Sequence, residues 1–308
     1  RLTLYEDYEI EGSGTDAGRY YATVTLTAPT GQWNVSVENG KIPAGQPLVK
    51  YDVPEDLRKL KSVLDTYNTY NNLSVAELDA YKQYLEQIAS DYDNTADPSK
   101  NLLVLPPSEF SSYIDRYNIA GVDLKKELVY RIQRSGRHPV RELKKKFWEL
   151  IVDTMHYEHD VRPIMIPLIE KLGIKTCVYC NVQYALTVNH SRGLFELDHR
   201  FPKSQYPFLC TSFYNLQPSC ASCNHGKRTA TSDFGLYTTD ESELRPFHLL
   251  ATPQLYLRKK RFDINKIQIH LVASDVHNIN LCNLAASHEK DFDIDATYNV
   301  LKDVAEET

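Results

Sequence analysis

Two Cys-x-x-Cys pairs constrain this chain more than any other feature of its sequence. They are CVYC at 177–180 and CASC at 220–223, with 39 residues between them. Each pair places two thiolates on one tight turn, and two such turns that face each other complete the tetrahedral sulfur cage favoured by Zn²⁺. The spacing therefore predicts one structural zinc ion, with its ligands at Cys177, Cys180, Cys220 and Cys223.

Two other uses of paired cysteines compete with this interpretation. Disulfide bonds are typical of secreted chains, and nothing in the sequence suggests secretion. A thioredoxin-like redox site needs only one such motif, set in a βαβ pattern, and fits two pairs less well. Cys210 and Cys282 have no partner at a comparable spacing, so we expect both to be small buried apolar residues.

Composition narrows the class of protein further. The chain has 308 residues, 42% of them apolar, which is enough for a real core in about two domains. No apolar run approaches the roughly 18 residues of a membrane helix, and no charged-then-apolar leader opens the chain. We therefore expect a soluble protein with no membrane partner. Because zinc thiolates imply a reducing compartment, we expect it in the cytoplasm.

The formal net charge of −6 argues, taken alone, against a partner rich in phosphate. The charge is unevenly distributed, however. Residues 1–100 sum to −7 and residues 286–308 to −5, whereas residues 101–285 carry 24 basic and 18 acidic side chains. The middle of the chain therefore has a net charge of +6, and a nucleic acid stays a candidate partner for it.

The first hundred residues predict a small sheet followed by helices. Residues 19–27 and 33–37 are rich in β-formers and have turn residues between them, so a β-hairpin is expected. Leucines at helical spacing then predict a helix, and Ser74 with Glu77 forms a capping box for the next one. We assign residues 1–100 to an N-terminal β and helical region whose role the sequence does not show.

A basic helical region is expected over residues 101–175. Gly136 is placed to end one helix, and Pro139 and Pro163 are placed to begin two more. Residues 123–149 hold nine basic and four acidic side chains. Such a stretch is typical of a solvated helix face, although its position beside the cysteine pairs also favours contact with nucleic acid.

The segment after residue 235 predicts a smaller unit. Ile267, Ile269 and Leu271 alternate as in a half-buried strand. We expect residues 236–308 to form a C-terminal extension that packs on the core.

A second constellation lies between the cysteine pairs, in FELDHRFPKSQYPFLCTSFYNLQPSCASCNHGKRT. Asp198 and His199 stand at the end of an expected strand, Asn215 follows 16 residues after His199, and Asn224 comes directly after Cys223. Singly, such residues are typical of strand ends and turns. Together, at these spacings and inside a cysteine bracket, they indicate a functional site.

This constellation resembles the HNH endonuclease family, whose ββα-metal core is often braced by two Cys-x-x-Cys pairs. The resemblance covers residues 177–229 and implies a nuclease core at 176–235. The chain departs from the literal motif because Asn224 stands where the second histidine is expected, which is the HNN form. His225 is the neighbouring rival for that position.

The chemistry of phosphodiester hydrolysis explains these residue types. A neutral imidazole takes a proton from water near neutral pH, so the resemblance makes His199 the general base. It makes Asp198 and the amide oxygen of Asn224 the ligands of a catalytic Mg²⁺ or Mn²⁺, which prefer oxygen donors. Asn215 corresponds to the family's middle residue, with the expected task of holding the loop and orienting the His199 backbone.

Basic residues near the motif are expected to contact the substrate phosphate. Lys227 lies three residues after Asn224, so on a helix both project from one face. Arg200, Lys203 and Arg228 are further candidates for such contacts.

A narrower resemblance adds a biological context. LDHRFPKSQYPFL together with YNLQPSCASCNHGK is similar to the HNH nuclease component of Septu-type and retron-associated bacterial phage-defence systems. In those systems such a nuclease typically partners an ATPase, so the resemblance implies an ATPase or another defence-system protein as partner.

The expected fold is α+β, with an N-terminal β-hairpin, a helical region and a ββα-metal HNH nuclease core braced by a four-cysteine zinc site. The leading hypothesis is a metal-dependent endonuclease that hydrolyses DNA in anti-phage defence. The sequence does not distinguish DNA from RNA and shows no sequence preference. The alternative hypothesis is a zinc-stabilised nucleic-acid-binding subunit that is inactive alone and works within a complex.

Overall fold

The computed structural model describes residues 24–27, 34–37, 52–92, 100–133, 141–189, 192–238, 245–251 and 268–301. These residues form helices and small antiparallel sheets, which confirms the α+β class. The helices are α1 (Val53–Thr66), α2 (Asn68–Asn71), α3 (Val75–Tyr92), α4 (Phe110–Arg116), α5 (Phe147–Thr154), α6 (Arg162–Lys171), α7 (Ala221–Lys227), α9 (Ile279–Phe292) and α10 (Ile294–Leu301).

The strands pair two by two. Each pair is antiparallel and, in the described part of the chain, no sheet has more than two strands. The pairs are β1 (Val24–Thr27) with β2 (Asn34–Val37), β3 (Glu127–Gln133) with β4 (Arg141–Lys146), β5 (Leu186–Asn189) with β6 (Arg192–Leu194), β7 (Glu196–His199) with β8 (Leu216–Ser219), and β9 (Phe247–Ala251) with β10 (Ile269–Ala273). The β1–β2 pair confirms the expected N-terminal hairpin.

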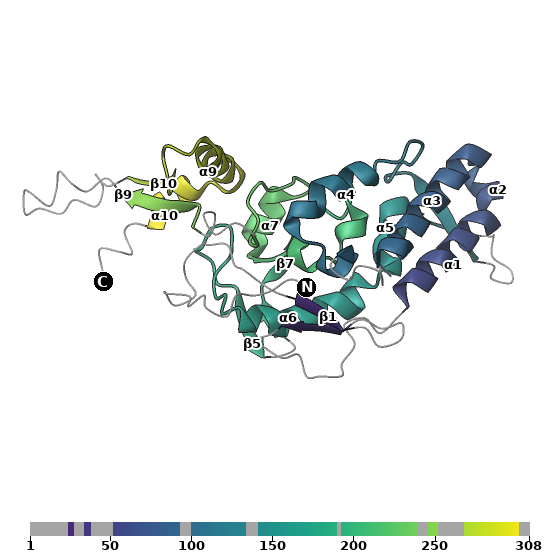
Figure 1. The fold of residues 1–308 in the computed structure, drawn as a ribbon, viewed down its shortest axis with the longest axis horizontal. Coiled ribbons are helices and arrows are strands. Elements are labelled where there is room, and N and C mark those ends of the chain that lie inside the picture. Colours follow the sequence, from purple (N-terminus) through teal and green to yellow (C-terminus); the bar gives the residue numbers. More distant parts are fainter. Residues whose placement is uncertain are drawn as a thin grey trace, which may run out of the picture.

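Helices α1 and α3 begin where the sequence predicts. The Asp52 carboxylate accepts a hydrogen bond from the Glu55 amide at 3.0 Å, and the Ser74 hydroxyl oxygen accepts one from the Glu77 amide at 3.2 Å. Because side chains satisfy these amides, which have no partner within the helix, each helix has a defined start. Figure 1 shows both helices at one end of the molecule and β9, β10, α9 and α10 at the other.

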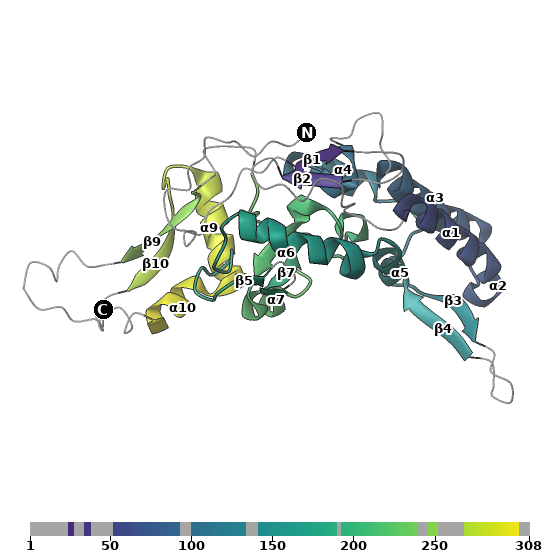
Figure 2. The same cartoon turned by 90° about the horizontal axis from the view of Figure 1, so that it is seen from below.

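The helix expected to begin at Pro139 and to carry residues 141–155 is wrong over its first part. The helix expected to end at Gly136 is wrong as well, because Glu127–Gln133 form strand β3. Residues 141–146 form β4, which pairs with β3 in a hairpin that projects from the helical end (Figure 2). Glu, Lys and Leu favour a helix in isolation, but here the partner strand supplies the backbone hydrogen bonds and cross-strand contacts. The Asn71 amide group also bonds both backbone groups of Val129, which fixes β3 against α2. The helix therefore starts later, at Phe147.

The β7–β8 pair is followed directly by α7, so two antiparallel strands and a helix succeed one another. Asp198 pairs with Gln217 and His199 with Leu216 across the two strands. Cys220 ends the second strand and caps α7, its sulfur accepting from the Cys223 amide at 3.4 Å. This local unit places the second cysteine pair and the Asp-His pair, and it lies in the middle of the molecule (Figure 1).

Aromatic stacking joins the two ends of the molecule to this central unit. Tyr117, after α4, stacks on Phe208 with ring centroids 4.0 Å apart. On the other side, Phe292 of α9 stacks on Tyr179 at 4.2 Å, and the Tyr298 hydroxyl donates to the Cys180 carbonyl at 3.0 Å. The described part of the C-terminal segment thus packs on the turn that carries the first cysteine pair. The proposed domain boundaries themselves stay predictions.

Candidate active site and metal cluster

The four cysteines of the two Cys-x-x-Cys pairs come together. All four are buried, and their sulfur atoms lie within 4.8 Å of one another. Cys180 and Cys220 are 4.0 Å apart, close to the edge of about 3.8 Å expected for a sulfur tetrahedron around zinc. The cluster can hold a metal ion such as zinc, as the spacing predicts.

The disulfide alternative is wrong, because all six cysteines are free thiols. Within the cluster, hydrogen bonds among the four thiols lower the pKa of Cys180 and Cys220 and raise the pKa of Cys177 and Cys223. The four thiols therefore share protons, which a metal ion has to displace when it binds. Cys210 is fully buried, and burial raises its pKa to about 12, in accord with a packing role. Cys282 is only partly buried, contrary to the expectation.

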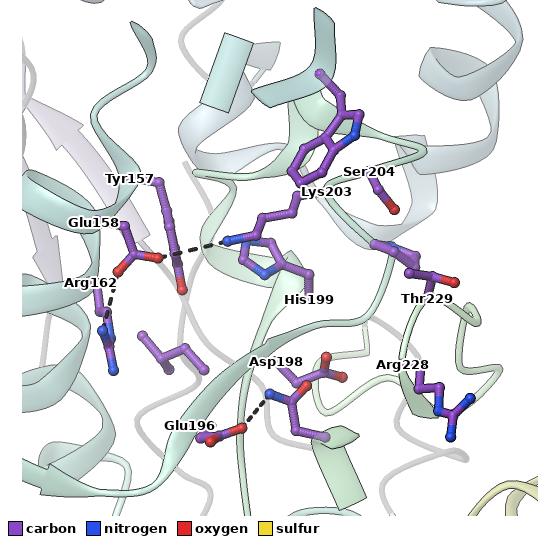
Figure 3. Close-up of a pocket in the computed structure, with 14 residues that line it drawn as sticks. Tyr157, Glu158, Arg162, Glu196, Asp198, His199, Lys203, Ser204, Arg228 and Thr229 are labelled. Atoms are coloured by element: carbon purple, nitrogen blue, oxygen red, sulfur yellow. Dashed lines mark hydrogen bonds and ion pairs between the residues drawn. The ribbon is translucent and has the colours of Figure 1, made fainter. Parts of the chain in front are cut away.

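A cavity of about 380 Å³ lies beside this cluster and gathers the predicted motif. Figure 3 shows Glu196, Asp198 and His199, which come from one strand, around the same space. Asn224 of α7 lines it as well. The cavity therefore brings Asp198, His199 and Asn224 together, whereas Asn215 lies outside its lining.

His199 is held in one orientation. Its Nε2 lies 3.0 Å from the Cys210 carbonyl oxygen, and its ring centroid lies 4.8 Å from that of Tyr157. A carbonyl oxygen only accepts, so Nε2 carries the proton and Nδ1 keeps its lone pair. Burial, with a smaller contribution from the nearby Lys203 ammonium, lowers the pKa of His199 to about 3. At neutral pH the ring is therefore uncharged, with the lone pair of Nδ1 free of a proton.

Acid is expected to destabilise the fold through this residue. The pKa of this histidine is near 3 in the folded protein and near 6.5 in the unfolded chain. Its contribution to the free energy of unfolding is therefore complete above pH 6.5 and is lost as the pH falls below that value. Between pH 7 and pH 5 the wild type should lose about 2 kcal/mol more of its free energy of unfolding than His199→Gln does. Urea titrations of both proteins at the two pH values measure the difference. If both proteins lost the same free energy of unfolding between pH 7 and pH 5, His199 would not be buried in its neutral form.

Asp198 is buried within a dense set of donors. The Tyr179 hydroxyl donates to its Oδ2 at 2.5 Å, and the Lys227 ammonium lies 3.0 Å from the same atom and 3.2 Å from Oδ1. Burial and the Asp198 charge raise the pKa of Tyr179 well above its usual value, so the phenol keeps its proton. Tyr179 belongs to the first Cys-x-x-Cys turn and thus links the cysteine cluster to the carboxylate.

Lys227 does not occupy the place predicted for it. Its side chain is 1% exposed, its Nζ also donates to the His199 carbonyl oxygen at 2.8 Å, and it is not among the residues that line the cavity. This internal ion pair does not support the expected phosphate contact. The sequence predicts that Lys227 and Asn224 lie on one face of a helix. In the structure the Lys227 side chain of α7 reaches β7, where the Asp198 carboxylate attracts its ammonium group.

Arg200 is engaged elsewhere too. Its guanidinium donates to the backbone carbonyl oxygens of Ser232 and Asp233 at 3.1 and 2.9 Å, so it fastens the segment that follows α7. Lys203 and Arg228, in contrast, do line the cavity. Lys203 is 3.7 Å from a Glu158 oxygen, and Arg228 is exposed.

Asn215 makes the loop contacts that were expected, but no hydrogen bond to His199. Its amide oxygen accepts from the Phe201 amide at 2.7 Å, while its amide nitrogen donates to the carbonyl oxygens of Phe201 and Leu209. Its backbone oxygen accepts from Arg200 at 2.9 Å. The side chain therefore holds the loop that leaves the strand just after His199, rather than His199 itself.

Asn224 and its rival His225 differ in their surroundings. Asn224 Nδ2 donates to Glu196 Oε2 at 2.5 Å, which leaves its Oδ1 available to a ligand on another side. His225 has 75% of its side chain exposed, is 3.6 Å from the other Glu196 oxygen and does not line the cavity. The geometry favours Asn224 over His225 as a donor into the cavity.

Sequence reasoning missed several residues of the cavity. Glu196 lies two residues before Asp198, so strand periodicity alone would have put both on one face. No comparable signal marks Trp148, Tyr157, Glu158 and Arg162, which reach the cavity from the preceding helices through tertiary packing.

The cavity has the donor chemistry of a divalent-cation site. Glu196, Asp198 and Asn224 line it, and carboxylate and amide oxygens are hard donors that suit Mg²⁺ or Mn²⁺. Over the described ranges, the four cysteines are the one group of three or more His, Cys, Asp or Glu ligand atoms close enough for a single ion. A cation in the cavity would therefore rely on few protein ligands and on water.

Comparison with known proteins gives a limited similarity. Over 69 residues the chain is 36% identical to the Septu protein PtuB of Bacillus thuringiensis. The aligned stretch is 22% of this chain and 25% of that protein, so the chain spans about a quarter of the relative's length. No protein-family model and no solved structure matches the chain. The similarity supports a relation to Septu proteins over that stretch.

None of the helices in the described part of the chain is both long enough and apolar enough to cross a bilayer.

Proposed function

We propose that the chain is a metal-dependent endonuclease of the HNH type that hydrolyses DNA phosphodiester bonds and acts in the cytoplasm in anti-phage defence. One observation carries the proposal: a strand–strand–helix unit braced by four clustered cysteines brings Asp198, His199 and Asn224 to one cavity. The relation to a Septu protein supports the defence role.

His199 supplies the proton transfer in this proposal. Its Nδ1 takes a proton from the attacking water, while its Nε2–H stays bonded to the Cys210 carbonyl oxygen. The bond keeps the ring from turning, and Tyr157 covers one side of it. A base fixed in this way needs no reorganisation during the reaction.

Asp198 and Asn224 would hold the catalytic Mg²⁺ or Mn²⁺, with Glu196 as a further oxygen donor or as the group that orients Asn224. The ion, when bound, compensates charge on the phosphate and on the leaving 3′-oxygen. Lys227 holds the buried Asp198 carboxylate in its orientation through their ion pair. Lys203 and Arg228, which line the cavity, are the phosphate contacts that fit this geometry.

Removing the Tyr179 hydroxyl is expected to weaken metal binding. Tyr179→Phe keeps the stack on Phe292 and deletes two hydrogen bonds, the one donated to Asp198 and the one accepted from Gln217 at 2.7 Å. Loss of such a partner behind a metal ligand typically lowers affinity about 10- to 100-fold. Calorimetric titration of Mn²⁺ into zinc-loaded protein measures the change, with Tyr184→Phe, an exposed tyrosine nearby in sequence, as the matched control. Equal Mn²⁺ affinities in the two variants would count against Asp198 as a ligand.

A plasmid-nicking assay tests the proposal as a whole. The purified chain should convert supercoiled plasmid to nicked and linear forms in Mg²⁺ or Mn²⁺ and should stop when EDTA is added, while zinc analysis verifies that the cysteine cluster stays loaded. Nicking that persists in EDTA with full zinc content would overturn the metal-dependent mechanism.

The second candidate function is a zinc-stabilised nucleic-acid-binding subunit that works only within a complex. The Septu relation favours it, because we infer by resemblance an ATPase or another defence protein as partner. Binding of DNA by the chain alone, with cleavage appearing only after the partner is added, would identify this case.

A further inference from the structure

A second cavity adjoins the proposed active site. Its volume is about 300 Å³. The two cavities share three lining residues, Glu158, Arg162 and Leu197. If one phosphate of a nucleic-acid strand lies beside His199 in the first cavity, the second cavity offers space for the adjacent nucleotide of that strand.

The second cavity combines apolar surface with positive charge. Phe195 and Ile166 are partly buried lining residues, and two lining arginines, Arg162 and Arg192, are exposed. Glu158 also lines it, but its carboxylate is paired with Arg162 at 3.2 Å and with Lys203 at 3.7 Å. A lining that combines apolar side chains with exposed guanidinium groups fits a flat aromatic group that carries a phosphate.

Gly193 sets the position of the aromatic ring. A Cβ at this residue would lie 2.5 Å from one carbon of the Phe195 ring and 2.7 Å from the next. The ring can therefore rest against the β6 backbone only because residue 193 has no side chain. Both residues line the second cavity, so the glycine fixes the aromatic wall.

We propose that the second cavity binds an unpaired base next to the cleaved phosphate, stacked on Phe195, so that the substrate is a single-stranded or locally unpaired nucleic acid. The inference rests on the proposed nuclease function. Unstacked bases commonly lie on aromatic rings and arginine planes. Within an intact duplex a base is covered by its neighbours, and extracting it costs a few kcal/mol, least where the strand is already unpaired.

The test measures binding and not cleavage. His199→Ala protein is titrated with a fluorescent 12-nucleotide DNA strand, the same RNA strand and the corresponding DNA duplex, and anisotropy gives each dissociation constant. We expect one of the single strands to bind more tightly than the duplex, and the two single-strand arms show whether DNA or RNA is preferred. A duplex that binds as tightly as both single strands would overturn the proposal.

The aromatic contact is tested in the same background. Adding Phe195→Ala should weaken single-strand binding by about 5- to 100-fold, the range of one lost base stack. Leu194→Ala, the exposed neighbour that does not line the cavity, should bind as its parent does. Unchanged affinity in Phe195→Ala would contradict the stacking role.

A set of strands, each with one abasic nucleotide at a different position, distinguishes loss of the stacking contact from misfolding of the Phe195→Ala variant. At the position that occupies the cavity, loss of the base should weaken binding by His199→Ala protein and should have little further effect on the Phe195→Ala double variant. If, at every position, the loss of affinity from removing the base simply added to the loss from Phe195→Ala, the proposed base subsite would be overturned. If the subsite binds as described but wild-type protein cuts no strand in Mg²⁺, the nuclease function fails and the binding site stands.

Discussion

His199→Ala is expected to lower the single-turnover rate of DNA nicking by about 10²- to 10⁴-fold, the contribution typical of a positioned general base. The structure gives the reason: Nε2 is engaged by the Cys210 carbonyl oxygen, and the unprotonated Nδ1 is the proton acceptor that the ring offers in the cavity. The rate of plasmid nicking in Mg²⁺, with enzyme in excess, measures the effect.

The matched control is His225→Ala. This histidine is close in sequence to Asn224, but it is exposed and lies outside the cavity lining, so its loss should change the rate by less than a few-fold. Both variants should keep the zinc content of the wild type, because neither residue belongs to the cysteine cluster. A His199→Ala protein that nicks at the wild-type rate would show that another group takes the proton.

Cys177→Ser should abolish the folded central unit. Structural zinc in small domains contributes about 10–16 kcal/mol of apparent binding free energy at neutral pH, as much as or more than the 5–15 kcal/mol by which whole proteins are typically stable. Cys177 is fully buried among the other three sulfurs. In the serine variant, water therefore cannot take the place of the missing sulfur ligand unless the turn opens. Zinc content should fall from one per chain to nearly none.

The loss of fold is measured by thermal unfolding and by protease resistance of the purified variant. Cys282→Ser is the control, since this thiol is partly exposed and stands outside the cluster, and its melting temperature and zinc content should match the wild type. A Cys177→Ser protein that melts cooperatively at the wild-type temperature without zinc would exclude a structural metal at this cluster.

The sequence predicted those parts of the site whose geometry is local. Cys-x-x-Cys turns fix the spacing of their own sulfurs, and the strand that ends at His199 and the helix that holds Asn224 follow directly from short-range patterns. The buried leucines of α1 and the capping box of α3 were recognisable for the same reason.

The parts that were missed depend on tertiary contacts. Residues 141–146 have helix-forming composition, and only pairing with β3 makes them a strand. Lys227 was expected to face the substrate, but the buried Asp198 carboxylate attracts its ammonium inward. Tyr157 and Arg162 enter the cavity from a segment some 40 residues before His199, a distance over which no local pattern operates.

Anomalous diffraction from crystals grown with Mn²⁺ tests the central claim most directly. Data at the zinc and manganese edges would locate both metals in one experiment. We expect a zinc peak among the sulfurs of the four clustered cysteines and a manganese peak in contact with the Asp198 carboxylate, beside Asn224 and His199. A zinc peak accompanied by no manganese at Asp198, under conditions in which the protein cuts DNA, would contradict the proposed metal-dependent centre.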